Sequence, residues 1–199
     1  MLPTLGIIGG IGSGKSVVAD ALQALGGHLI AADQLGHEAL QQADIKAQLV
    51  KRWGKQILDE NGEPDRKCIG AIVFADPKER RALEAIVFPY IENRIADEIA
   101  AAQARPDEKF IILDAAIMLE AGWDQQCDHI IFVEAPREVR LARLKEKRGW
   151  DEAKLLRREA AQMPLEEKRR HADAVIVNDE SPVKVADQVQ RLLLQWRII

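Results

Sequence analysis

The segment Gly9-Gly-Ile-Gly-Ser-Gly-Lys-Ser16 decides the fold of this chain. It matches the phosphate-loop pattern G-x-x-x-x-G-K-[ST] at every fixed position. An apolar run at residues 5–9 precedes it, and a helical pattern of apolar residues at 16–25 follows it. Glycines let the backbone curl so that successive N–H groups face an anion, and the start of the helix adds positive potential. We predict that the chain binds a nucleoside triphosphate.

The side chains of this loop predict how the nucleotide is held. Lys15 can reach the β- and γ-phosphates, and the Ser16 hydroxyl suits a Mg²⁺ ion. The other positions offer backbone N–H groups to the phosphates. The predicted nucleotide-binding residues of this segment are Gly9, Gly12, Ser13, Gly14, Lys15, Ser16 and Val17.

Further strands and helices alternate along the chain. Strand character recurs at 28–32, 110–114, 129–133 and 174–177, and helical patterns lie at 137–147, 152–162 and 182–196. Short apolar strands that alternate with helices indicate a five-stranded parallel sheet covered on both faces, which is a three-layer α/β sandwich. Residues 34–105 hold no convincing strand and read as several helices interrupted by Gly54, the turn at 61–64, Pro77 and Pro89.

This pattern predicts a core with two additions. We expect the nucleotide-binding core at 1–33, 106–136 and 171–199, a helical substrate lobe at 34–105 and a lid at 137–170. The lid region holds twelve Lys or Arg and seven Asp or Glu, so it is basic within a chain of net charge −4. It is either a solvated helical face or an element that closes over an anion.

Two carboxylates are candidates at strand ends. Asp33 follows the second predicted strand, where it could accept the proton of an attacking hydroxyl, help to hold the metal or cap the next helix. Asp114 ends the third predicted strand and could help to hold the metal from outside its direct ligands, or could cap the next segment. Glu120 is a weaker candidate nearby. On the basic helix, Arg143 shares one face with Arg140 and Lys147 and could neutralise phosphate charge.

Composition and motifs narrow the class of function. A GTPase is expected to carry an NKxD-type motif, which does not occur, whereas a small chain with a helical insertion and a basic late helix favours a small-molecule kinase. In such an enzyme a lid excludes water from the transferring phosphate. A kinase for another acceptor and a nucleotide-binding regulatory module without transfer activity are the alternatives.

Several other classes of protein are disfavoured by the composition. The net charge of −4 disfavours a nucleic-acid-binding protein. No apolar run approaches the roughly 20 residues that span a bilayer, and no cleavable signal precedes the first motif. Cys68 and Cys127 lack the spacing of a zinc site or a disulfide framework. We expect a cytoplasmic protein, a monomer or weak homo-oligomer, with no membrane or nucleic-acid partner.

Nearly the whole chain resembles the dephospho-coenzyme A kinase family. The matching segments are the phosphate loop, 29–33, 73–77, 89–91, 113–114, 143–144, 162–168, 172–173 and Asn178. The resemblance implies a nucleoside-monophosphate-kinase-like core and ATP-dependent phosphorylation of the ribose 3′-hydroxyl of dephospho-coenzyme A, the last step of coenzyme A synthesis. It also implies that Asp33 is the general base, that Arg143 contacts the phosphates and that the region of Asn178 lies near the adenine.

Five positions depart from the family pattern. They lie around the expected acceptor site rather than in the phosphate loop, and they are Ala31, His37, Phe88, Ala116 and Val177. At Ala31 one acidic group of the family pattern is missing. These departures affect the assignment of the phosphate acceptor more than the assignment of ATP as the donor.

Overall fold

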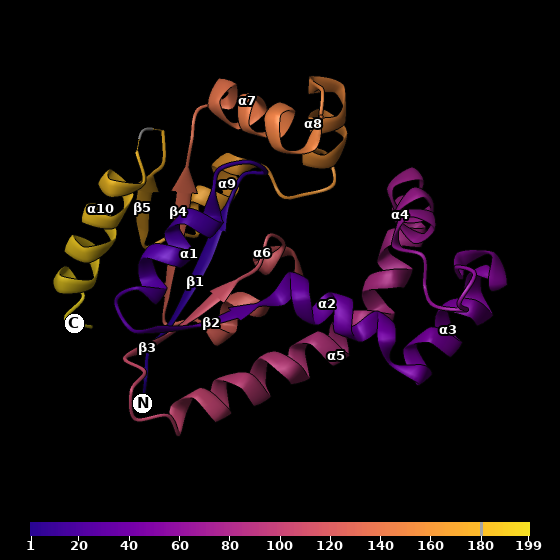
Figure 1. The fold of residues 1–199 in the computed structure, drawn as a ribbon, viewed down its shortest axis with the longest axis horizontal. Coiled ribbons are helices and arrows are strands. Elements are labelled where there is room, and N and C mark those ends of the chain that lie inside the picture. Colours follow the sequence, from indigo (N-terminus) through magenta and orange to yellow (C-terminus); the bar gives the residue numbers. More distant parts are fainter. Residues whose placement is uncertain (180) are drawn as a thin grey trace. The chain divides into compact units, whose positions relative to one another are not determined.

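The structure, a computed structural model, describes residues 1–179 and 181–199. Within these residues, five parallel strands form one sheet in the order β2-β3-β1-β4-β5 (Figure 1). The strands are β1 (Thr4–Gly9), β2 (Gly27–Ala31), β3 (Phe110–Asp114), β4 (His129–Glu134) and β5 (Ala174–Val177). The predicted α/β class and the five-stranded parallel sheet are therefore confirmed.

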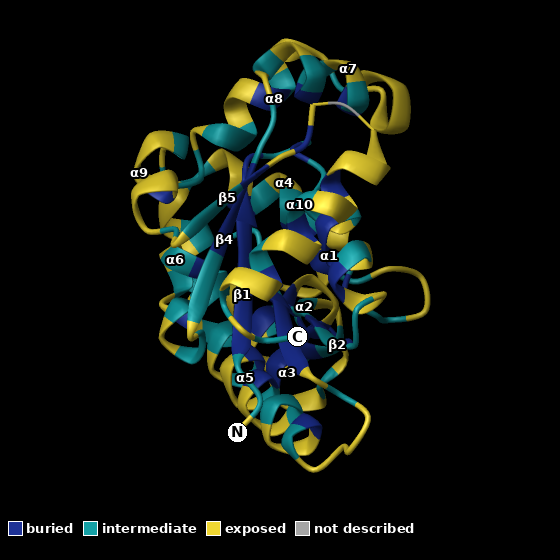
Figure 2. Ribbon diagram, turned by 90° about the vertical axis from the view of Figure 1, so that its left-hand side faces the viewer, coloured by how far each residue is buried: buried dark blue, intermediate teal, exposed yellow. Residues whose placement is uncertain are grey.

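The central strand β1 is buried along its whole length. Its apolar side chains Leu5 and Ile7 are fully buried, and β3 and β4 pair with it on either side. A strand covered on both faces needs a continuous apolar sequence, which the segment before the phosphate loop supplies. Figure 2 shows β1 as a buried ribbon among helices whose outer faces are exposed. The register sets Asp114 of β3 beside Ile7 of β1, so their carboxyl ends share one edge.

The larger of two compact units comprises residues 1–31 and 96–199 and contains the sheet. Its helices are α1 (Lys15–Gln23), α6 (Met118–Ala121), α7 (Arg137–Arg148), α8 (Glu152–Glu159), α9 (Leu165–Arg170) and α10 (Pro182–Gln195), with a 3-10 helix at Trp123–Gln126. Apolar residues of α1 and α10 complete the core of this unit against the strands. The short helix α9 is absent from the sequence prediction.

The second unit comprises residues 32–95 and is helical. It contains α2 (Ala32–Gln41), α3 (Ala43–Trp53), α4 (Arg66–Ala75), most of α5 (Pro77–Gln103) and a 3-10 helix at Lys55–Ile57. The boundary at 95 falls inside α5. The expected limits of the substrate lobe, 34–105, and of the lid, 137–170, stay predictions.

Helix α5 corrects one expectation, because Pro89 lies inside it and does not interrupt it. A proline inside a helix removes one backbone hydrogen bond and costs about 3 kcal/mol. Buried Val87, Ile91 and Ile95 flank the proline and hold both halves of the helix in the apolar core. Although α5 has 27 residues, neither it nor another helix of the described chain is long and apolar enough to cross a membrane.

Candidate active site

The phosphate loop joins β1 to α1 through a tight backbone curl. Gly12 and Gly14 have φ values of 80° and 85°, a left-handed conformation that side chains disfavour. The Ser13 N–H donates to the Gly10 carbonyl at 3.0 Å, and the Val17 N–H donates to the Gly14 carbonyl at 3.0 Å. The N-terminus of α1 therefore opens directly from the loop, as an anion-binding loop requires.

Close packing adds a second reason for glycine in this loop. A Cβ atom at Gly12 would lie 2.9 Å from the Arg140 carbonyl oxygen, and one at Gly14 would collide with the Asn178 amide. The neighbours belong to α7 and to the segment that follows β5. Contacts with these two segments therefore require glycine at both positions, in addition to the backbone conformation of the loop itself.

Asn178 binds the loop backbone. Its side chain is 2% exposed, and its Nδ2 donates to the carbonyl oxygens of Ser13 at 2.8 Å and Gly14 at 3.4 Å. Its backbone N–H donates to the Glu134 carbonyl at 2.8 Å. Asn178 therefore fixes the two residues that precede Lys15.

Arg143 reaches the backbone of the same loop from α7, and its predicted role with phosphates stays a prediction. Its Nη1 donates to the Ser13 carbonyl at 3.2 Å, and its Nη2 donates to Asn178 Oδ1 at 3.4 Å. The guanidinium is thereby held beside the loop. A planar cation in this position can neutralise charge on a bound polyphosphate.

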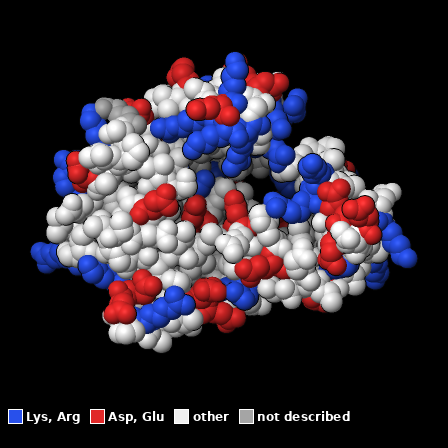
Figure 3. Space-filling view, in the orientation of Figure 1, with Lys and Arg blue, Asp and Glu red and all other residues white. Residues whose placement is uncertain are grey.

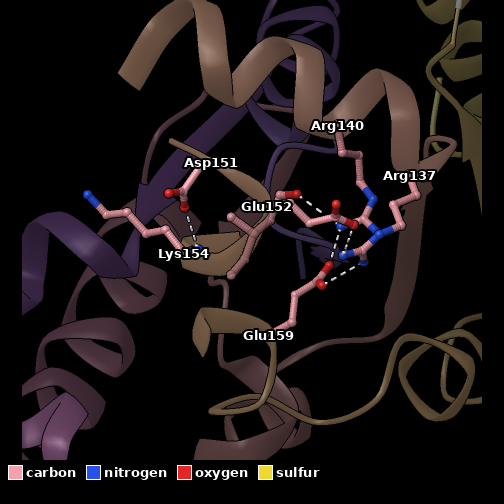
Figure 4. Close-up of polar contacts among 7 residues, drawn as sticks. Arg137, Arg140, Asp151, Glu152, Lys154 and Glu159 are labelled. Atoms are coloured by element: carbon pink, nitrogen blue, oxygen red, sulfur yellow. Dashed lines mark hydrogen bonds and ion pairs between the residues drawn. The ribbon is translucent and has the colours of Figure 1, made fainter. Parts of the chain in front are cut away.

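Arg140 behaves differently from Arg143, although the two lie on one predicted face. Its side chain is 5% exposed, and Nη1 donates to the Ile11 carbonyl at 3.2 Å and to Glu159 Oε1 at 2.6 Å. Arg137 bonds to the other oxygen of Glu159 at 2.9 Å (Figure 4). Burial alone would raise the pKa of Glu159, but the two arginines hold it below its ordinary value. Arg140 thus joins the loop to α8.

Other cations of α7 and α8 gather around Trp150. The charged groups of Arg148, Lys154 and Arg158 lie 5.6, 5.1 and 5.7 Å from the centre of its ring. Lysine and arginine side chains crowd this part of the surface over α7 and α8 (Figure 3). Concentrated positive charge of this kind attracts anions such as polyphosphates.

The remaining predicted residues occupy the starts of helices and the end of a strand. Lys15 and Ser16 are the first two residues of α1, with Lys15 half-buried and Ser16 exposed. Asp114 is half-buried at the end of β3. Asp33 is exposed in the first turn of α2, within the helical second unit, and is not the residue that precedes the helix.

The residues at hand fit a magnesium ion. The described residues contain no cluster of three or more His, Cys, Asp or Glu that could hold a metal. Mg²⁺ does not need one, because it keeps several waters and takes one or two protein oxygens together with the phosphates. The Ser16 hydroxyl and the Asp114 carboxylate are oxygen donors of this kind.

Lys168 of α9 ends the family-matching segment 162–168, but the sequence alone assigns it no role. It is 1% exposed, and its Nζ donates to the Ala116 carbonyl at 2.8 Å and lies 2.9 Å from Glu120 Oε1. Burial lowers the pKa of its ammonium, Glu120 opposes this, and the charge of Lys15 lowers the pKa further. The burial of Lys168 is thus accompanied by a carboxylate partner and two further acceptors, Ala116 and Gln162.

Comparisons with known proteins show which family the chain belongs to. A family model for dephospho-CoA kinase matches residues 3–184. The dephospho-CoA kinase of Geobacter metallireducens is 40% identical over 189 residues, which cover 94% of each chain. The crystal structure of TT1252 from Thermus thermophilus has a TM-score of 0.83 at 31% identity and covers 98% of this chain and 97% of that one. A dephospho-CoA kinase structure from Campylobacter jejuni shares the fold, with a TM-score of 0.71 at 22% identity over 98% of both chains.

Proposed function

Because the chain belongs to the dephospho-CoA kinase family, we propose that the residues described above carry out the phosphoryl transfer of that family. The reaction is the ATP-dependent phosphorylation of dephospho-CoA in coenzyme A biosynthesis. The oxygen of the ribose 3′-hydroxyl attacks the γ-phosphorus, the bond to the bridging oxygen breaks, and ADP leaves.

One observation carries the assignment of the ATP site: Arg143 and Asn178 both bind the phosphate-loop backbone at Ser13. The loop is thereby set before ATP arrives, so its N–H groups need no reorganisation to meet the phosphates. Lys15 neutralises the β- and γ-phosphates, and Arg143 adds a second cation beside them. Asn178 serves the nucleotide by fixing the loop.

The carboxylates complete the proposal. Asp33 accepts the proton of the attacking hydroxyl, since a carboxylate within reach of an acceptor can act as general base. The Ser16 hydroxyl and Asp114 would hold the magnesium ion. When bound with ATP, that ion supplies charge neutralisation at the β- and γ-phosphates.

The test measures ADP release by the purified protein with and without dephospho-CoA. Release should depend on this acceptor, and Asp33→Asn should lower kcat by about 100-fold to 10,000-fold, as expected for loss of a general base. Asp44→Asn is the matched control, because Asp44 also lies in the first turn of a helix of the second unit. An unchanged kcat in Asp33→Asn would remove Asp33 from the mechanism.

The same assay decides between the alternatives. Turnover only with a nucleoside monophosphate or a sugar alcohol would assign another acceptor, and tight ATP binding without any turnover would favour a regulatory module. The cytoplasmic location and the monomeric or weakly homo-oligomeric state also remain proposals. Light scattering of the purified protein tests the latter.

A further inference from the structure

Lys168 is buried more completely than its charge alone would favour. All three donors of its ammonium have acceptors, because Gln162 Oε1 at 3.5 Å joins the Ala116 carbonyl and Glu120. A buried ion pair seldom stabilises a fold more than apolar side chains of the same volume, since both charges lose their hydration. Stability is therefore a poor account of a lysine at this position.

The partners of Lys168 belong to two segments that meet beside the site. Ala116 and Glu120 follow Asp114 directly after β3, whereas Gln162 precedes α9. Glu120 Oε1 also accepts a hydrogen bond from the Met163 backbone N–H at 2.8 Å. The segment 114–120 is thus tied to the segment 162–168 by the side chains of Lys168 and Glu120 together.

The other end of α9 reaches the phosphate loop. A Cβ atom at Gly10 would lie 3.2 Å from both methyl carbons of Leu165, so the Leu165 side chain packs against the loop backbone. Helix α9 therefore contacts the phosphate loop through Leu165 and the segment after Asp114 through Lys168. It connects the residues that bind phosphate to the residue proposed to hold the metal.

We propose that Lys168 is a positioning residue for phosphoryl transfer, which holds the segment after Asp114 in a fixed place beside the phosphate loop. The proposal rests on the proposed function of Lys15 and Asp114. The bond to residue 116 uses its backbone carbonyl, so the alanine that departs from the family pattern there leaves this contact intact.

The test compares Lys168→Met and Glu120→Gln with Arg169→Met. Methionine keeps the length of the lysine without its donors, and glutamine keeps the hydrogen-bond acceptor without its charge. Arg169 is the matched control, because it is the next residue of α9 and is half-exposed, in a surface pair with Glu134. The measurements are kcat, KM for ATP, binding of ATP by titration calorimetry, and amide hydrogen exchange.

The proposal expects kcat to fall about 10-fold to 100-fold in Lys168→Met, because small displacements of reacting groups cost rates of this size. KM and Kd for ATP should change by less than about threefold, since Lys15, Arg143 and Asn178 remain. Exchange should accelerate at 115–121 and 162–168. Glu120→Gln should show a smaller loss of kcat, and the double variant should be no worse than Lys168→Met alone.

A folded Lys168→Met protein with normal kcat and normal exchange at 115–121 would overturn the proposal. A lower melting temperature with normal kcat would also overturn it, since that result shows a purely structural role. Should Lys168→Met not fold, Glu120→Gln decides by the same two measurements. A wild-type protein without acceptor-dependent ADP release would instead refute the proposed function.

Discussion

Two carboxylates of this protein each form an ion pair with a buried cation. In both pairs the cation also donates a hydrogen bond to a backbone carbonyl. Glu159 holds Arg140, which also donates to the Ile11 carbonyl, and Glu120 holds Lys168, which also donates to the Ala116 carbonyl. Arg140 thereby connects α7 to the phosphate loop, and Lys168 connects α9 to the segment that follows β3. We name the two ion pairs the Glu159 pair and the Glu120 pair.

The cations of the two pairs differ in chemistry. Arg140 shares Glu159 with Arg137, and arginine side chains in proteins stay charged over the range in which carboxylates titrate. Lys168 has an ammonium whose pKa is lowered by burial and by Lys15. The Glu159 pair therefore fails only when its carboxylate is protonated, whereas the Glu120 pair contains a cation that can lose its proton. We expect the Glu159 pair to stabilise α7 and α8, and we propose that the Glu120 pair positions the segment after Asp114.

The largest effect on stability should come from Glu159→Ala. Removing this carboxylate leaves Arg140 buried without its counter-charge, which costs about 3 kcal/mol for a buried pair. In a chain of this size the melting temperature should then fall by roughly 6–12 °C. Calorimetry of Glu159→Ala against Glu152→Ala measures the difference, because Glu152 is 61% exposed and pairs with Arg137 only at the surface. Equal losses in both variants would show that burial of Arg140 does not matter.

Acid should next weaken the Glu159 pair. Because the folded pKa of Glu159 is lower than its ordinary value of 4.5, its stabilisation is fully present above pH 4.5. It is lost as the pH falls through the lower folded pKa. Urea denaturation of the wild type and of Glu159→Gln should therefore differ most above pH 4.5, and the difference should shrink below it. A difference that stays constant down to pH 3.5 would contradict a role for this carboxylate charge.

The sequence predicts the phosphate loop and the sheet much better than it predicts the two buried ion pairs. The phosphate loop and the strands follow from local patterns, because a glycine-rich turn between a buried strand and a helix has few solutions. The expectation that Arg143 contacts the phosphates comes from the family resemblance. Arg140 shares the predicted face of Arg143, yet its burial depends on Glu159 of another helix. Positions on one helix face therefore predict which residues are neighbours, but they do not predict that Arg140 is buried against a carboxylate of α8 whereas Arg143 binds Ser13 and Asn178.

The burial of Lys168 is harder still to predict from the sequence. This lysine stands in the run Leu165-Glu-Glu-Lys-Arg-Arg170, whose composition indicates an exposed segment, and helix α9 is too short to give a clear periodic pattern. Its burial arises from Ala116 and Glu120, which are distant in the sequence. Pro89 illustrates the same point, since tertiary packing on both sides keeps α5 continuous where the local rule predicts a break.

The smallest effect should come from the start of α8, the helix that carries Glu159. The Asp151 side chain accepts a hydrogen bond from the Lys154 N–H at 2.7 Å and so caps the helix (Figure 4). Asp151→Ala should cost about 1 kcal/mol, whereas Asp151→Asn should retain most of the cap. The melting temperature of the alanine variant should fall by roughly 2–4 °C.

Hydrogen exchange of the Asp151→Ala protein tests whether the two pairs are independent. A frayed start of α8 loosens the support of Glu159, so exchange should accelerate in α8 and remain at the wild-type rate at 115–121, where the Glu120 pair is intact. Faster exchange at 115–121 as well would mean that both pairs open together. Since the backbone N–H of Met163, which follows α8, donates to Glu120, that result would make the segment after α8 the connection between them.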